Sequence, residues 1–191
     1  VFAGVIGPFS LAARLIDVTE VMVACYDEPD MVHTVLDKVS TFLIDYINAY
    51  KAVGAHGVMM AEPLAGVISP ALEKDLSAPY VKKIVEAVQD ENFLVVYHNC
   101  GNNINLMIDS IFSCGAKAYH FGNAVDMESD IIAKVPSDVI VMGNVDPAGV
   151  LRMGTPDTVK AATVSLMDRC CKYGNFVLSS GCDIPPMTPW E

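Results

Sequence analysis

Short apolar runs alternate along the chain with longer segments in which apolar residues recur every three or four positions. The runs have the length of strands, and the longer segments have the period of amphipathic helices. Such alternation is typical of βα units, in which helices connect the strands of a parallel sheet. The pattern predicts six strands, at residues 1–6, 57–61, 93–97, 116–120, 139–142 and 176–178.

Most of these strands are continuously apolar, as expected where structure covers both faces of a parallel sheet. Strand 116–120 is the exception because Lys117 interrupts it, so its assignment depends on its place in the alternation. A long helical region separates the first two strands, and an apolar stripe follows residues 32–50. Asp27 followed by Pro29 is suited to the start of that helix.

Helix signals continue through the second half of the chain. One helix is expected at about residues 70–89, and a shorter one follows Asn102. Another begins at Thr155, where a capping residue precedes a proline at the first helical position, and Gly174 stops it.

Six βα units predict an α/β fold, a (β/α)8 TIM barrel that lacks about two N-terminal units, with an open sheet as the alternative. No repeat or charge block marks a second domain, so residues 1–191 are expected to form a single domain. Val1 in place of an initiator Met indicates the C-terminal part of a longer barrel. Unpaired strand edges would favour homo-oligomers, and we expect this piece alone to be inactive.

Composition narrows the class of protein. Residues are 52% hydrophobic and 18% charged, which is typical of a globular chain. A net charge of −11 argues against nucleic acid, whose binding depends on Lys and Arg. Neither a run of about 20 apolar residues nor a secretory signal is seen, which predicts a cytoplasmic protein without a membrane span. The six cysteines are irregularly spaced and read as reduced thiols rather than a disulfide framework.

Two cysteines and a histidine follow predicted strands. His98 and Cys100 lie two residues apart at the end of strand 93–97, so both side chains should point to one side, and Cys182 follows strand 176–178. Parallel barrels build active sites at these carboxyl ends. One imidazole and two thiolates suit zinc and leave a fourth position open, as in catalytic sites. The alternative is a buried histidine and two small apolar cysteines.

Four further residues are candidates on the same face. Glu62 ends strand 57–61 and could ligate zinc or act as an acid/base, or be a solvated loop carboxylate. His120 ends strand 116–120 and could orient substrate or move a proton, although a hydrogen-bonded structural role is the commoner one. Asn144 and Asp146 follow strand 139–142 and could contact substrate or cofactor, or shape a turn. The remaining cysteines are expected to be structural: Cys25, Cys114, Cys170 and Cys171.

Four phrases of the sequence resemble, in this order, the uroporphyrinogen decarboxylase superfamily, and the resemblance covers essentially the whole chain. Within that superfamily, the His-x-Cys pair and the late Gly-Cys are similar to the zinc-dependent corrinoid:coenzyme M methyltransferases, whereas the decarboxylase itself needs no metal. The phrases are GPFSLA (7–12), YHNCG (97–101), GNVDP (143–147) and SGCDIP (180–185).

The resemblance implies that His98, Cys100 and Cys182 hold zinc in a (β/α)8 barrel, of which this chain supplies roughly strands three to eight. It also implies a mechanism in which zinc takes a small thiol such as coenzyme M as its fourth ligand and lowers the pKa of that thiol. The methyl group would come from a methylcorrinoid carried by a separate corrinoid protein. The alternatives are a porphyrinogen decarboxylase and a non-catalytic protein that binds a thiol or corrinoid.

Overall fold

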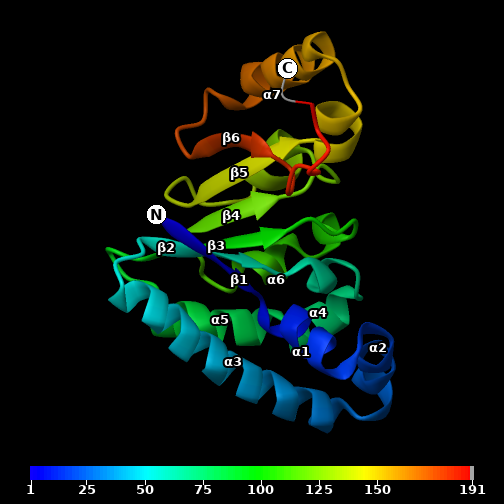
Figure 1. Cartoon of the computed structure of the whole chain (residues 1–191), viewed down its shortest axis with the longest axis vertical. Coiled ribbons are helices and arrows are strands. Elements are labelled where there is room, and N and C mark those ends of the chain that lie inside the picture. Colours follow the sequence, from blue (N-terminus) through cyan, green and yellow to red (C-terminus); the bar gives the residue numbers. More distant parts are fainter. Residues whose placement is uncertain (190–191) are drawn as a thin grey trace. The chain divides into compact units, whose positions relative to one another are not determined.

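The computed structural model describes residues 1–189, and six strands form one sheet in chain order (Figure 1). The pairs β1–β2, β2–β3, β4–β5 and β5–β6 are all parallel, and helices alternate with the strands. The predicted α/β alternation is therefore confirmed. The strands are β1 (Phe2–Ile6), β2 (Gly57–Ala61), β3 (Leu94–Asn99), β4 (Ala118–Phe121), β5 (Ile140–Val145) and β6 (Phe176–Ser180).

Strands β4, β5 and β6 have other ends than predicted, and in each case polar residues lie at the end that differs. β5 continues to Val145 rather than 142, and β6 continues to Ser180 rather than 178, because backbone pairing extends through Asn144↔Ser179. Hydrophobicity alone does not detect strand residues that are polar. β4 begins at Ala118 rather than 116, which leaves Lys117 outside the strand with its N–H donating to Gln89 Oε1 at 3.0 Å.

The chain divides into two compact units, residues 1–117 and 118–191. The first contains β1 to β3, and its helices differ in number from the prediction. Two short 3-10 helices, Pro63–Gly66 and Ile104–Leu106, complete this unit. Its α-helices are α1 (Pro8–Ile16), α2 (Val18–Asp27), α3 (Pro29–Ala52), α4 (Pro70–Leu76), α5 (Ala78–Val88) and α6 (Ile108–Phe112).

Backbone breaks explain these extra helices. Asp17 has a φ of 101° between α1 and α2, and its carboxylate caps α2 by accepting the Thr19 N–H at 2.8 Å. As predicted, α3 begins at Pro29. A single helix over 70–89 is wrong, because α5 has Pro79 near its start and a proline inside a continuous helix would lack an N–H and clash with the preceding turn.

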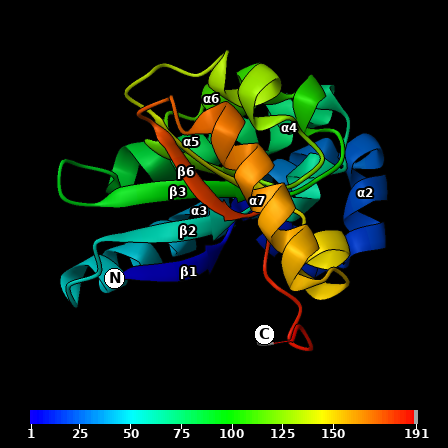
Figure 2. The same ribbon diagram turned by 90° about the horizontal axis from the view of Figure 1, so that it is seen from above.

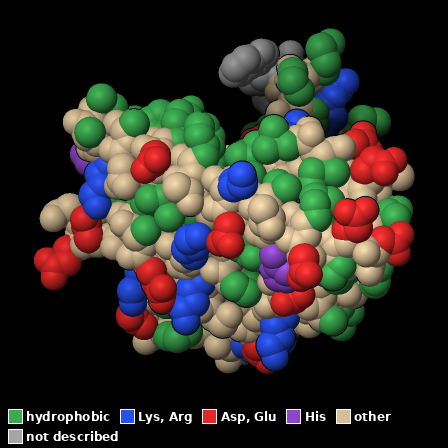
Figure 3. All heavy atoms as spheres, turned by 90° about the horizontal axis from the view of Figure 1, so that it is seen from below, with side chains coloured by type: hydrophobic (Ala, Val, Ile, Leu, Met, Phe, Trp, Pro, Cys, Tyr) green, Lys and Arg blue, Asp and Glu red, His purple; other side chains and the backbone are tan. Residues whose placement is uncertain are grey.

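One face of the first unit's strands is covered by α1, α3 and α5 (Figure 1). The buried residues of α3 recur at helical spacing, and two of them, Val32 and Leu36, pack with Phe9 of α1 and Leu76 of α4 in one apolar cluster. From above, α2 lies beyond the carboxyl end of β1 (Figure 2). The outer side of this layer carries interspersed acidic and basic side chains (Figure 3), including a Lys83–Asp37 pair at 3.0 Å. These helices therefore bury their apolar side and expose their charged side to solvent.

The second unit contains β4 to β6, two π-helical turns (Met127–Ile132 and Pro147–Arg152) and α7 (Pro156–Cys170). Thr155 caps α7 as predicted: its hydroxyl accepts the Thr158 N–H at 3.3 Å, and the Thr158 hydroxyl accepts the Thr155 N–H at 2.7 Å. Two ion pairs, Arg169–Asp126 and Lys172–Glu128, connect the end of α7 to the start of the π-helical turn Met127–Ile132. No helix within residues 1–189 has the length and apolar character needed to cross a bilayer.

Replacing the cap of α7 should weaken the fold measurably. Thr155→Ala removes the hydroxyl of the capping box, and we expect the free energy of unfolding to fall by about 1 kcal/mol. Thr155→Ser retains the hydroxyl and should stay close to the native value. Urea unfolding followed by circular dichroism measures both, and equal stabilities of the Ala and Ser variants would contradict the capping role.

Candidate metal centre

His98 and Cys100 stand at the carboxyl end of β3. His98 is the second-last residue of this strand and is 7% exposed, while Cys100 is half-buried and follows the strand directly. On the β2 side, Ala61 pairs with His98 in register, and the Glu62 N–H donates to the His98 carbonyl at 2.8 Å. The backbone that carries His98 is thus fixed by its neighbouring strand.

Asn99, between these two residues, was not singled out from the sequence. Its side chain is fully buried, accepts the Gly101 N–H at 2.9 Å and donates to the Tyr97 hydroxyl at 3.1 Å. The available signal was a polar residue at a position that the apolar strand pattern assigns to the interior.

Cys182 belongs to the second unit and follows β6. The Gly181 N–H donates to the Val145 carbonyl at 2.7 Å, and the Ser180 hydroxyl donates to the Cys182 carbonyl at 2.8 Å. A Cβ added at Gly181 would lie 2.9 Å from the Asn123 backbone nitrogen, so only glycine fits this approach. The half-buried Cys182 thiol is therefore carried by a tightly held turn.

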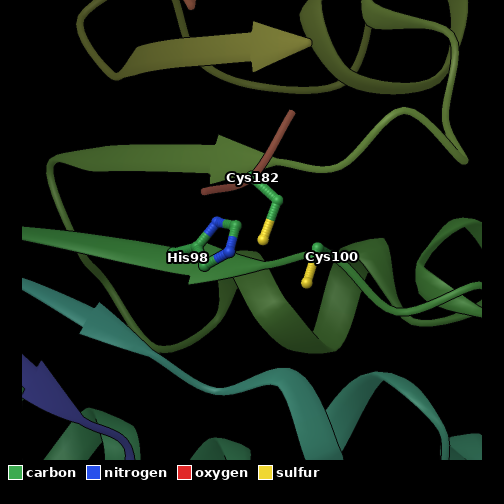
Figure 4. A group of neighbouring side chains, drawn as sticks. All are labelled: His98, Cys100 and Cys182. Atoms are coloured by element: carbon green, nitrogen blue, oxygen red, sulfur yellow. The ribbon is translucent and has the colours of Figure 1, made fainter. Parts of the chain in front are cut away.

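His98, Cys100 and Cys182 form a group whose ligand atoms all lie within 4.8 Å of one another (Figure 4). One imidazole and two thiols are also the donor types that zinc prefers. The donor set therefore fits zinc.

Glu62 is fully buried, so the interpretation of a solvated loop carboxylate is wrong. Its oxygens accept the N–H groups of Phe9 at 2.9 Å and Ser10 at 2.7 Å, at the start of α1. Burial raises the pKa of Glu62 to about 7, against the lowering effect of the hydrogen bonds from Ser10 and Phe9. A Cβ at Gly7 would lie 2.5 Å from Oε2, so the glycine makes room for the carboxylate. Its acid/base or ligand role stays a prediction.

His120 is buried at the end of β4, and its Nε2 donates to the Ser180 carbonyl at 2.7 Å. Burial lowers the pKa of this ring, which favours the neutral form. These observations agree with the structural alternative for His120, in which it holds the end of β6. Its contact with substrate stays a prediction.

Asn144 and Asp146 both bond to nearby backbone. Asn144 donates through Nδ2 to the Gly122 carbonyl at 3.0 Å and the Val125 carbonyl at 2.7 Å. Asp146 Oδ1 accepts the N–H groups of Ala148 and Gly149, each at 2.9 Å. These bonds match the turn-shaping alternative for this segment. Contact of either residue with substrate or cofactor stays a prediction.

Comparisons with known proteins add family information. The sequence model of the family described as uroporphyrinogen decarboxylase (URO-D) matches residues 1–191. A uroporphyrinogen decarboxylase of Psychromonas ingrahamii is 30% identical over 197 residues, which cover 97% of this chain and 54% of the relative. The methylcobamide:CoM methyltransferase MtbA of Methanosarcina mazei is 32% identical over 191 residues, which cover 99% of this chain and 54% of the relative.

Among solved structures, a methyltransferase from Methanosarcina mazei matches with a TM-score of 0.86 at 26% identity, covering 97% of this chain and 53% of that chain. The likeness confirms a partial α/β barrel of the TIM type. The chain spans about half the length of the curated relatives it matches. Relatives with both names match at similar identity, so the comparisons show a family of enzymes without choosing between methyl transfer and decarboxylation.

The buried carboxyl of Glu62 should make stability depend on pH. Because its folded-state pKa of about 7 lies above the usual glutamate value of 4.5, the folded chain binds more protons than the unfolded chain between these pH values. Stability from this group is fully present below about pH 4.5 and is lost as the pH rises through about 7, by roughly 3 kcal/mol. Urea unfolding of the metal-free chain at pH 4.5 to 8 should show this loss.

The Glu62→Gln variant isolates this effect, because it keeps the size of the side chain and has no proton to lose. The unfolding free energy of the native chain minus that of Glu62→Gln should therefore fall by roughly 3 kcal/mol as the pH rises across that range. Glu86→Gln, on the exposed surface of α5, serves as the control for losing a carboxylate. A difference that is constant with pH would show that Glu62 does not titrate there.

Proposed function

The chain belongs to the uroporphyrinogen decarboxylase family, and we propose that it acts in zinc-dependent methyl transfer from a methylated corrinoid to a small thiol. The observation that supports this choice is the group of His98, Cys100 and Cys182. In a site for a thiol acceptor, they supply the ligands that zinc prefers.

The proposed roles follow from the donor set. His98, Cys100 and Cys182 would hold zinc and leave room for one further ligand, and a thiol bound there would have a lowered pKa, so that its thiolate is present at neutral pH. His98 and Cys100 would supply two ligands from β3, and Cys182 the third. Glu62 at the end of β2 would ligate zinc in the absence of substrate or move a proton, and His120 would orient substrate or act as an acid/base.

The methyl donor and partner are proposed from the named relative, a methylcobamide:CoM methyltransferase. We propose coenzyme M or a similar small thiol as the acceptor, and a methylcorrinoid on a separate corrinoid protein as the donor. Asn144, near the end of β5, and Asp146, directly after it, are the proposed contacts to substrate or corrinoid. Cytoplasmic location and homo-oligomer formation stay predictions.

The length of the relatives supports a further part of the proposal. The chain spans about half of each relative. We therefore propose that residues 1–191 belong to a single (β/α)8 barrel domain and form its C-terminal part. Methyl transfer then belongs to the longer protein, whereas the ligand residues lie in the present chain.

Decarboxylation of a porphyrinogen is the second candidate, since a decarboxylase relative matches at 30% identity over almost the whole chain. The two candidates differ in their need for metal. A zinc-dependent methyltransferase stops working when a chelator removes the metal, and a metal-free decarboxylase continues. The His-x-Cys pair favours the first candidate.

Metal content tests the ligand set directly. The purified chain, reconstituted with zinc and dialysed, should hold one ion per chain by elemental analysis, and Cys182→Ala should bind it at least about tenfold more weakly. Cys171→Ala is the matched control, because this exposed cysteine of the same unit lies outside the group. Equal zinc affinity of the two variants would refute Cys182 as a ligand.

Activity separates the two candidate reactions. The longer protein should form the methyl thioether of coenzyme M from methylcobalamin, lose this activity with a chelator and regain it with zinc. Cys182→Ala should reduce the rate by more than about tenfold. Chelator-resistant decarboxylation of a porphyrinogen, without thioether formation, would overturn methyl transfer.

A further inference from the structure

A fully buried amide side chain separates the two proposed ligands of β3. Asn99 follows His98 and precedes Cys100, and alternation along an extended strand directs its side chain away from theirs. We propose that Asn99 is a positioning residue, which holds the turn after β3 in a metal-binding shape before the metal arrives. This inference rests on the proposed zinc site.

Two hydrogen bonds connect Asn99 to both ends of the segment. Its Oδ1 accepts the Gly101 N–H at 2.9 Å, which closes a local turn around Cys100. Its Nδ2 donates to the hydroxyl of Tyr97 at 3.1 Å, and the Tyr97 side chain is itself buried. One side chain therefore fixes the backbone direction at which Cys100 leaves the strand.

The 3-10 helix Pro63–Gly66 closes the other side of this turn. A Cβ added at Gly66 would lie 2.2 Å from Asn99 Oδ1 and 2.7 Å from Gly101 Cα. A Cβ at Gly101 would lie 2.4 Å from Gly66 Cα, so the two glycines are in direct backbone contact. The backbone of Gly66 therefore lies close to the oxygen of Asn99, and a side chain at this position would displace it.

Each proposed ligand of β3 then has its own restraint. The backbone of His98 is held by the N–H of Glu62 from β2. Cys100 lies beyond the strand ladder, and the restraint on its turn comes from Asn99. Loss of the amide would leave the buried Gly101 N–H without this acceptor, a cost that the turn can avoid only by opening. The structure therefore predicts that Asn99 affects Cys100 more than His98.

Metal titration of three variants tests the inference. Asn99→Leu keeps the approximate size and loses both bonds, Asn99→Asp keeps an acceptor for the Gly101 N–H, and Tyr97→Phe removes the hydroxyl to which Asn99 donates. Asn175→Leu is the control, because the half-buried Asn175 donates to the Val139 carbonyl at 2.9 Å in the second unit. Zinc affinity is measured by chelator competition, and Co²⁺ spectra report thiolate ligation.

We expect Asn99→Leu to weaken zinc binding at least about tenfold and to reduce the thiolate-to-cobalt absorption, as loss of Cys100 would. Asn99→Asp and Tyr97→Phe should fall between Asn99→Leu and the native chain. In the metal-free chain, hydrogen exchange at the Gly101 amide should be faster in Asn99→Leu and unchanged in Asn175→Leu. If Asn99 contributed only to general stability, Asn99→Leu would lower the free energy of unfolding but leave zinc affinity and the cobalt spectrum unchanged.

A folded Asn99→Leu chain with native zinc affinity and cobalt spectrum would overturn the inference while leaving the proposed function intact. If Asn99→Leu does not fold, native affinity in both Asn99→Asp and Tyr97→Phe would overturn it equally. A native chain that takes up no zinc or cobalt would instead overturn the proposed function itself, and the positioning role with it.

Discussion

The parallel register of β2 and β3 is the constraint on which the candidate site depends. It aligns Ala61 with His98, and the next N–H, that of Glu62, continues the ladder to the His98 carbonyl. The last residues of both strands therefore reach the same edge of the sheet. Because parallel strands share a direction, chemical groups placed after each strand gather there without any special loop.

Burial of Glu62 is a second consequence of this register. The carboxyl enters the interior at the end of β2 and meets the first N–H groups of α1, which offset part of the cost of removing it from water. Gly7 leaves the space that this arrangement requires. A group whose pKa is about 7 beside a strand that carries candidate metal ligands is suited to proton movement near neutral pH.

Family membership and residue chemistry answer different questions about this chain. The family match and the TM-score of 0.86 show which fold it adopts, and relatives named for two reactions share that fold. A fold supports many reactions, so the choice depends on side chains. Here the donor atoms of one histidine and two cysteines support a soft metal ion, and this supports methyl transfer to a thiol.

Local rules determined much of the structure in advance. Apolar runs located six strands, Pro29 located the start of α3, and Thr155 located the cap of α7, because each signal acts between near neighbours in the chain. The spacing of His98 and Cys100 likewise placed both at the end of one strand. The division of residues 70–89 into two helices is also local, because Pro79 disfavours a continuous helix through this segment.

Only the tertiary structure decided how the polar candidates are used. Glu62 bonds to residues more than 50 positions away, and His120 bonds to Ser180, 60 positions away. No local pattern marks such partners, because they are set by which strands and helices pack together. Periodicity and capping fix the backbone from adjacent residues, whereas burial, pKa and hydrogen-bond partners arise from segments that meet only on folding.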